Sequence, residues 1–156
     1  MRPAIAAPRR ELEDDRSALE RRLDQVAQRD ALAGDDADLA FTALALQHAC
    51  SALESVIERT VRFFDDGLPS GPEWHRALLA RGALDIPGVR PAILSKESLI
   101  GARALLAFRH FLQHDYGADL DAPRMGEMQS LVARWRPAIE ADLDRLDHWL
   151  SEAAGQ

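Results

Sequence analysis

The sequence predicts an all-α fold, and three observations support this prediction. Apolar residues recur at three- and four-residue spacing in several long segments, β-branched residues are scattered, and glycine, proline and aspartate clusters separate the segments. The chain has 156 residues, of which 47% are hydrophobic, enough for one domain with a sizeable core. We therefore expect an antiparallel bundle of about five helices, with an added N-terminal helix.

The first predicted helix covers residues 8–32. Leu12, Leu19 and Val26 recur every seven residues, Leu23 lies in the same stripe, and the other faces are densely charged. A stripe this narrow fits either a bundle helix with one buried side or an arm that packs on a partner chain. The Gly-Asp-Asp sequence that follows breaks the pattern and offers an N-cap for the next helix.

The second predicted helix covers residues 38–64. Its core face, at three- and four-residue spacing, comprises Leu46, Cys50, Leu53, Ile57, Val61 and Phe64. His48 and Glu54 are predicted to lie off that face. An Asp-Asp-Gly sequence ends the helix.

A short third helix is expected over residues 73–81, after a Ser-Gly-Pro cap, and Gly82 closes it. Trp74 and His75 at its start fit a packing corner, although His75 could also line a cleft. Residues 85–91 are expected to form a rigid extended loop, because the residues before its two prolines are excluded from helix.

The fourth predicted helix covers residues 96–114, with Ser95 as its N-cap and Gly117 placed to end it. Its spacing defines two adjacent sides. They comprise Leu99, Arg103, Leu106 and His110 on one side and Ile100, Ala104, Ala107 and Phe111 on the next.

Asp121 is expected to cap a fifth helix that reaches about residue 150. Its apolar stripe comprises Met128, Leu131, Trp135, Ile139, Leu143, Leu146 and Leu150. We therefore assign residues 1–34 to an N-terminal helical extension and residues 35–152 to the bundle. Residues 153–156 are a tail, with fraying from Ser151 onward.

Composition excludes several kinds of function. The formal net charge is −7, which argues against a surface steered broadly onto nucleic acid but allows a local basic cleft. Cys50 is the only cysteine, so an intrachain disulfide and a thiolate metal cluster are excluded. No apolar run approaches the roughly 20 residues that cross a bilayer, and residues 1–10 lack the apolar core of a signal peptide. We expect a cytoplasmic location and no membrane.

The segment most suggestive of chemistry runs Arg-His-Phe-Leu-Gln-His-Asp-Tyr over residues 109–116. Arg109 has a permanent charge and a fork of donors that suits phosphate oxygens. A histidine transfers protons near neutral pH. Together they meet the minimum needs of phosphodiester chemistry, so Arg109 and His114 are candidate catalytic residues.

Arg109 and His114 are five residues apart, so on an ideal helix they point about 140° apart. They converge if the helix ends early or swings a side chain around, and Gly117 makes an early end plausible. They also converge if two copies of the helix meet across a twofold axis and share one cleft. The sequence leaves both solutions open.

The same residues have plain structural interpretations. Arg109 could be a surface arginine paired with Asp115 or another neighbouring acid, His114 a helix-terminal histidine favoured by the dipole, and Tyr116 an aromatic lid on the bundle end. His110 and His114 lie on one helix face and could bind a metal. However, a phenylalanine replaces the glutamate of the zinc-protease motif and no third ligand is evident.

An Arg-x4-His sequence that ends a helix in an all-α domain of this size resembles the HEPN superfamily of metal-independent ribonucleases. Residues 109–114 fit that pattern. The added His-x-Tyr, which ends at Tyr116, is typical of the HepT toxin branch. Three further segments resemble a HepT-like group: Trp74-His75, the Ile-Pro-Gly-Val-Arg-Pro loop at 86–91 and the Phe-Arg-His-Phe sequence at 108–111. The resemblance covers roughly residues 39–150.

The resemblance implies a homodimer in which the two Arg-to-Tyr segments face each other, and RNA cleavage without a metal or other cofactor. Arg109 would bind the scissile phosphate, and His114 would be the general acid or base for attack by the RNA 2′-OH. His110 and Asp115 would be auxiliary polar groups. The resemblance also implies an antitoxin partner, a minimal (MNT-type) nucleotidyltransferase that transfers AMP onto Tyr116. The alternatives are a non-catalytic HEPN module for dimerisation or nucleotide binding and a plain structural bundle.

Overall fold

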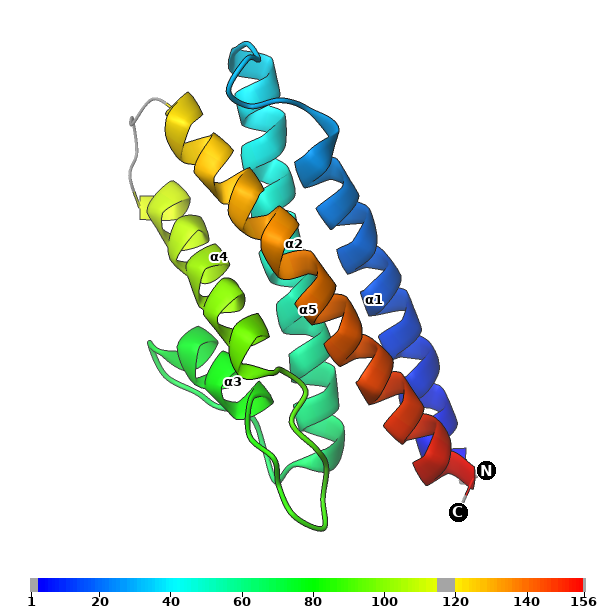
Figure 1. The fold of residues 1–156 in the computed structure, drawn as a ribbon. Coiled ribbons are helices and arrows are strands. Elements are labelled where there is room, and N and C mark those ends of the chain that lie inside the picture. The colour runs from blue at the N-terminus through cyan, green and yellow to red at the C-terminus, as the bar shows by residue number, and fades with distance from the viewer. Residues whose placement is uncertain (1–2, 115–119, 156) are drawn as a thin grey trace.

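The computed structural model describes residues 3–114 and 120–155, which form five helices and no strand. The helices are α1 (Pro3–Gln28), α2 (Asp36–Phe64), α3 (Trp74–Gly82), α4 (Lys96–His114) and α5 (Ala122–Gly155). The four long helices lie side by side, and the short α3 packs near the N-terminal end of α4 and against α2 (Figure 1). The predicted all-α helical bundle is confirmed.

The end of α1 is set by a contact from a distant helix. The sequence pattern predicted residues 8–32, whereas α1 spans Pro3–Gln28 and contains Pro8. The side chain of Gln129 in α5 donates to two carbonyl groups at this end, those of Val26 at 2.8 Å and Arg29 at 2.6 Å. These bonds satisfy carbonyls that a longer helix would have used.

The bounds of the other helices follow their local caps. Asp35 and Asp38 form a capping box at the start of α2, two residues before the predicted start. The bounds of α4 are as predicted. The tail predicted from Ser151 is wrong over residues 151–155, because α5 continues to Gly155. Ala154, with 5% of its surface exposed, packs into the core and makes this last turn part of the bundle.

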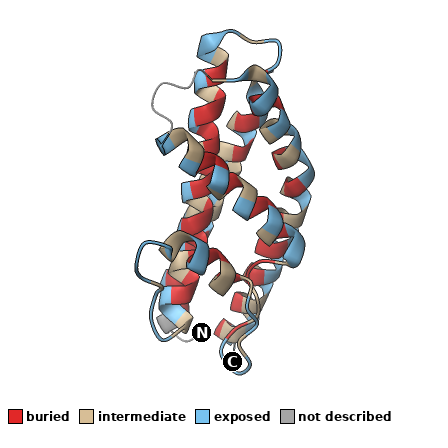
Figure 2. Ribbon diagram, turned by 90° about the vertical axis from the view of Figure 1, so that its left-hand side faces the viewer, coloured by how far each residue is buried: buried red, intermediate tan, exposed pale blue. Residues whose placement is uncertain are grey.

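A single core holds the bundle together, and it lies between the inner faces of the helices (Figure 2). Its largest fully buried side chains are Leu19, Leu23, Leu46, Leu53, Ile57, Leu78, Leu79, Ile93, Leu94, Leu105, Met125 and Ile139. Each such side chain contributes about 1.5–3 kcal/mol by leaving water. The leucines of α1 belong to this core, so α1 is a bundle helix that packs within its own chain.

The helix α2 is long and apolar enough to cross a membrane by length and composition alone. Its most apolar 18-residue window is, however, 56% buried inside the bundle. The same helix carries the buried carboxylate of Glu54. Among the described residues, α2 is therefore the core helix of the bundle.

The loop before α4 is organised around Arg90, whose side chain is fully buried. Its guanidinium donates to both carboxylate oxygens of Asp65, at 2.6 and 2.8 Å. The other three N–H groups donate to the carbonyls of Arg81, Leu84 and Pro91, at 3.0–3.2 Å. All five donors of the guanidinium are satisfied, so Arg90 fastens the loop to the ends of α2 and α3.

Burial of Asp65 opposes its ionisation, but hydrogen bonds from Arg90 and Arg81 outweigh that effect and lower the pKa of Asp65. The carboxylate is therefore held in its charged form in the folded chain. This buried ion pair is matched in charge and geometry, the condition under which such pairs persist.

The first turns of α4 are held closely against α5. Ser95 donates through its backbone N–H and its hydroxyl to Asp142, at 2.8 and 2.9 Å, and Trp135 Nε1 donates to the carbonyl of Ser98 at 2.9 Å. A Cβ on Gly101 would lie 2.0 Å from the Trp135 ring. Only glycine allows the two helices to approach this closely.

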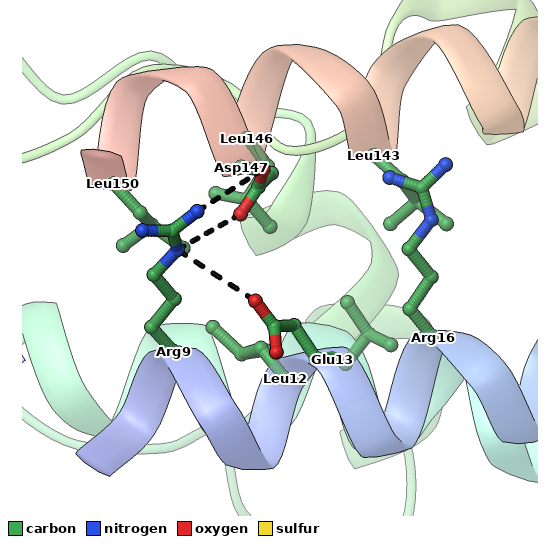
Figure 3. Close-up of a pocket in the computed structure, with 9 residues that line it drawn as sticks. Arg9, Leu12, Glu13, Arg16, Leu143, Leu146, Asp147 and Leu150 are labelled. Atoms are coloured by element: carbon green, nitrogen blue, oxygen red, sulfur yellow. Dashed lines mark hydrogen bonds and ion pairs between the residues drawn. The ribbon is translucent and has the colours of Figure 1, made fainter. Parts of the chain in front are cut away.

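A small hollow of about 120 Å³ lies between α1 and α5 (Figure 3). Arg9 reaches across it to Asp147, at 3.1 Å, and lies 3.9 Å from Glu13 on its own helix. Arg16 at the other end of the hollow is bonded to Asp144 and Glu20. These charged side chains pair with one another across the contact between α1 and α5. The hollow is therefore part of the packing of these two helices.

Candidate functional site

The helix α4 places the predicted site residues on different sides. Arg109 is buried, with 8% of its surface exposed, whereas His110 and His114 are exposed. Arg109 and His114 belong to one uninterrupted helix, so the helix does not end between them. A reoriented side chain and a second copy of the chain remain as the two ways to bring an arginine and a histidine of this type together. Asp115, Tyr116 and Gly117 lie outside the described residues.

Arg109 is the centre of a polar network inside the bundle. Its Nη1 donates to Oε1 of Glu54 and, at 3.2 Å, to Oγ of Ser51. Its Nη2 lies 3.0 Å from Nδ1 of His75. The interpretation of Arg109 as a surface arginine is therefore wrong. Its acidic partner comes from α2, 55 residues away in the sequence.

The Arg109–Glu54 pair is nearly closed to solvent, with the two side chains 9% and 7% exposed. An unpaired charge in such a place costs several kcal/mol. The pair therefore exists as a unit, and removal of either member strands the other. Sγ of Cys50 lies 4.0 Å from Oε1 of Glu54. Burial raises the pKa of Cys50 to about 12, with an opposing effect of Arg109 and a smaller raising effect of Glu54.

The prediction that Glu54 lies off the core face of α2 is wrong, because Glu54 is buried. Its position was readable from spacing: Glu54 follows Cys50 by four residues and precedes Ile57 by three, so it shares their face. An isolated acid on a core face requires a buried cation. The partner Arg109, on another helix, could not be read from that spacing.

His75 connects this buried network to the surface. Its Nδ1 contacts Oε2 of Glu54, its ring stacks on Trp74 with centroids 3.7 Å apart, and 37% of its side chain is exposed. His75 thus fits the interpretation as a packing corner, and it also lines a groove on the surface.

The groove lies between α3 and α4 and encloses about 400 Å³. Its walls are formed by Pro72, Glu73, His75, Arg76, Arg103, Leu106, Ala107 and His110. Two arginines and two histidines face a single acid there, so an acidic chain carries a local cationic groove. Arg76 lies 3.6 Å from Glu73, and both side chains are largely exposed, so this surface pair is weak.

His110 on the groove wall is next to His114, with ring centroids 4.2 Å apart. This contact extends the line of imidazoles from the groove to the last turn of α4. Within residues 3–114 and 120–155, no group of three or more His, Cys, Asp or Glu side chains is placed to hold a metal ion. A zinc site on His110 and His114 would therefore lack a third protein ligand among the described residues.

The fold and the Arg-x4-His spacing define a helical bundle of the HEPN class. The model of a HepT-like protein family matches residues 41–150, which is more than half of the chain, and the chain therefore belongs to that family. It is a HEPN toxin family whose members are typically ribonucleases. Comparison with curated proteins and with solved structures gave no match. The helix α1 lies wholly outside the matched residues.

Proposed function

We propose that this chain is the toxin of a toxin–antitoxin system and acts as a metal-independent endoribonuclease in the cytoplasm. The observation that carries the proposal is the family match, which includes the whole of residues 109–116. The cationic groove between α3 and α4 supports it, because RNA binding by an acidic chain needs a local basic surface.

In the proposed reaction the RNA 2′-OH attacks the adjacent phosphorus and the bond to the 5′ oxygen breaks. His114 moves a proton as general acid or base, and Arg109 binds the phosphate and stabilises its developing charge. Three N–H groups of Arg109, one on Nε and two on Nη2, have no acceptor among the described residues when the proton of His75 is on Nδ1. His110 and Asp115 are auxiliary polar groups.

We also propose a homodimer in which the two α4 helices face each other and complete a shared cleft. The exposed side of α4 supports this arrangement, because Ile100, 69% exposed, lies in line with Arg103, Ala107, His110 and His114. An exposed isoleucine beside site residues suits a self-complementary contact. Sedimentation equilibrium of the purified chain tests it, and a monomer at micromolar concentration would contradict it.

The proposed antitoxin is an MNT-type nucleotidyltransferase that adds AMP to Tyr116. Tyr116 is two residues after His114. The AMP added there carries negative charge and bulk, which would repel RNA from the site. Intact mass after incubation with the partner and ATP tests this step. We expect a gain of one or more AMP units that Tyr116→Phe abolishes.

The cleavage proposal is tested with purified chain, a labelled RNA and excess chelator. Wild type is expected to cleave and to leave a 2′,3′-cyclic phosphate, and His114→Ala is expected to be inactive. His114 is a cleaner test than Arg109, because it is exposed and its removal strands no buried charge. Intact RNA after prolonged incubation with the wild-type dimer would overturn the proposal.

A second candidate is a non-catalytic HEPN module for dimerisation or nucleotide binding. The burial of Arg109 against Glu54 favours it, because a phosphate has to compete with a carboxylate already in place. This candidate predicts that substitutions at His114 change partner binding while no RNA is ever cleaved.

A further inference from the structure

We infer that His75 is a second proton-transfer residue of this site, oriented by Glu54 and facing RNA bound in the groove between α3 and α4. The inference rests on the proposed ribonuclease function and names a residue outside the Arg-to-Tyr segment. It also assigns the groove to the RNA backbone next to the scissile phosphate.

The orientation of the imidazole follows from its contacts. The Nδ1 of His75 meets Oε2 of Glu54, and an ionised carboxylate only accepts hydrogen bonds, so we assign the proton of a neutral ring to Nδ1. Nη2 of Arg109 lies 3.0 Å from the same nitrogen, and with the proton on Nδ1 this contact is between two donors and is no hydrogen bond. The other nitrogen, Nε2, then carries the lone pair on the side of the ring away from the buried carboxylate. Trp74 stacks on the ring and fixes its plane.

The buried arginine has a positioning effect in this arrangement. Arg109 donates to Oε1 of Glu54, while the other oxygen of the same carboxylate meets His75. The guanidinium, the carboxylate and the imidazole therefore form one chain from the core to the groove. A carboxylate behind an imidazole fixes its tautomer and stabilises the imidazolium that forms when it takes up a proton.

The groove has the size and charge for RNA backbone. Its volume of about 400 Å³ is in the range of small-molecule sites, which suits one nucleotide unit. Arg76 and Arg103 stand on its two walls as exposed cations for phosphate oxygens. His110 shares the groove with His75 and adjoins His114, so RNA that passes through it can reach both proton-transfer residues.

Cleavage by 2′-OH attack needs two proton transfers, one from the 2′-OH and one to the leaving O5′. His114 on α4 supplies one of them, so a second group is needed for the other. Nε2 of His75 accepts the 2′-OH proton as the 2′ oxygen bonds to phosphorus. The phosphorus–O5′ bond breaks, and protonated His114 gives its proton to the leaving O5′. The products are a 2′,3′-cyclic phosphate and a 5′-hydroxyl, with both histidines in exchanged protonation states until they re-equilibrate with water.

The test compares His75→Asn with His75→Ala in the cleavage assay. Asparagine keeps an N–H at the place of Nδ1 and so preserves the bond to Glu54, but it has no group that takes up a proton. We expect at least about a 100-fold loss of cleavage rate in both variants, with RNA affinity and melting temperature of His75→Asn near wild type. In the pH profile, His75→Asn loses the limb that rises with pH.

His148→Asn is the matched control, because His148 also pairs with a glutamate, Glu152, but is exposed on α5 and does not line the groove. It is expected to cleave at the wild-type rate. Arg103→Ala is expected to weaken RNA binding about tenfold or less, with a smaller effect on the rate at saturation.

The outcomes separate the two proposals. If the wild type leaves RNA intact, the ribonuclease function fails. If the wild type cleaves, His114→Ala is inactive and His75→Asn cleaves as fast as His148→Asn, the role of His75 fails and the ribonuclease stands. If His75→Asn is active but His75→Ala is not, His75 serves only to hold Glu54, and the inference is overturned.

Discussion

Arg90 and Arg109 are both buried and both paired with a carboxylate of α2 or of its end, yet they differ in what surrounds them. Arg90 uses every N–H it has, on two carboxylate oxygens and three carbonyls. Arg109 shares its carboxylate with His75, a half-exposed side chain that opens onto a groove. The first arginine closes a loop, and the second links the core to the surface.

The difference separates an arginine with a purely structural set of contacts, Arg90, from the arginine proposed for chemistry, Arg109. Both lie in segments that resemble the HepT-like group, the loop at 86–91 and the segment at 109–116. A guanidinium with all five donors taken has no capacity to bind a substrate. The guanidinium of Arg109 shares the carboxylate of Glu54 with the accessible imidazole of His75. It can therefore influence a ligand that contacts that imidazole.

The largest expected effect is the loss of Arg90. Arg90→Met strands Asp65 with one remaining arginine and leaves three carbonyls unbonded, so we expect the free energy of unfolding to fall by about 3–5 kcal/mol. Urea denaturation followed by circular dichroism measures it. Arg62→Met is the control, because Arg62 is exposed and its one ionic partner among the described residues is Glu58, one turn away, and it should cost no more than about 0.5 kcal/mol. A loss below about 1 kcal/mol for Arg90→Met would contradict its structural role.

Loss of Arg109 is expected to be the second largest effect. Arg109→Met should cost about 2–3 kcal/mol, less than Arg90→Met because Glu54 keeps His75 as a partner. The double variant Glu54→Leu with Arg109→Met should recover more than half of that loss, since no unpaired charge remains. A double-mutant cycle in urea measures the coupling, and additive costs would show that the two side chains do not act as a pair.

The ion pair between Asp65 and Arg90 should make the free energy of unfolding depend on pH in the acid range. Because the pKa of Asp65 is lowered in the folded chain, its contribution to stability is complete above the unfolded pKa near 3.8 and is lost as the pH falls below that value. Asp65→Asn removes this contribution. Its unfolding free energy, measured from about pH 5 to about pH 3, should therefore change less steeply than that of the wild type. Equal slopes would count against the Asp65 pairing.

The smallest expected effect concerns Cys50, whose Sγ lies 4.0 Å from Oε1 of Glu54. With a pKa of about 12 and a buried side chain, its thiol should not react measurably with iodoacetamide at neutral pH in the native chain. The urea-unfolded chain is the positive control. Arg109→Met should label faster than its loss of global stability alone explains if this region opens locally, and Arg90→Met should not.

The sequence predicted the elements whose ends are set locally. The bounds of α4 follow from Ser95 and the apolar stripe after it, and the capping aspartates mark the start of α2. The end of α1 was misplaced because Gln129 sets it from about a hundred residues away. The last turn of α5 was missed because its burial depends on a neighbouring helix, which no local pattern reveals.

Local sequence supplied the residues of the candidate site but only part of their surroundings. Arg109 and His114 stood out by residue type and spacing, and His75 was recognised as a candidate for the cleft. Glu54 could have been placed on the core face from its spacing to Cys50. What local sequence could not supply was the pairing of side chains from α2, α3 and α4, because that depends on how three helices pack.

Gly101 has a mechanical consequence for the far end of its helix. The helix α4 is clamped to α5 at its N-terminal turns, and His114 lies thirteen residues beyond Gly101, or roughly 20 Å at 1.5 Å per residue. The helix is thus a lever with its pivot at Gly101 and its tip at His114. A methyl group at the pivot that tilted α4 by about 5° would swing the tip by about 1.7 Å over that length. In the proposed reaction a misplacement of His114 by about 1 Å would cost on the order of 100-fold in rate, so Gly101 sets the position of a histidine that lies far from it along the helix.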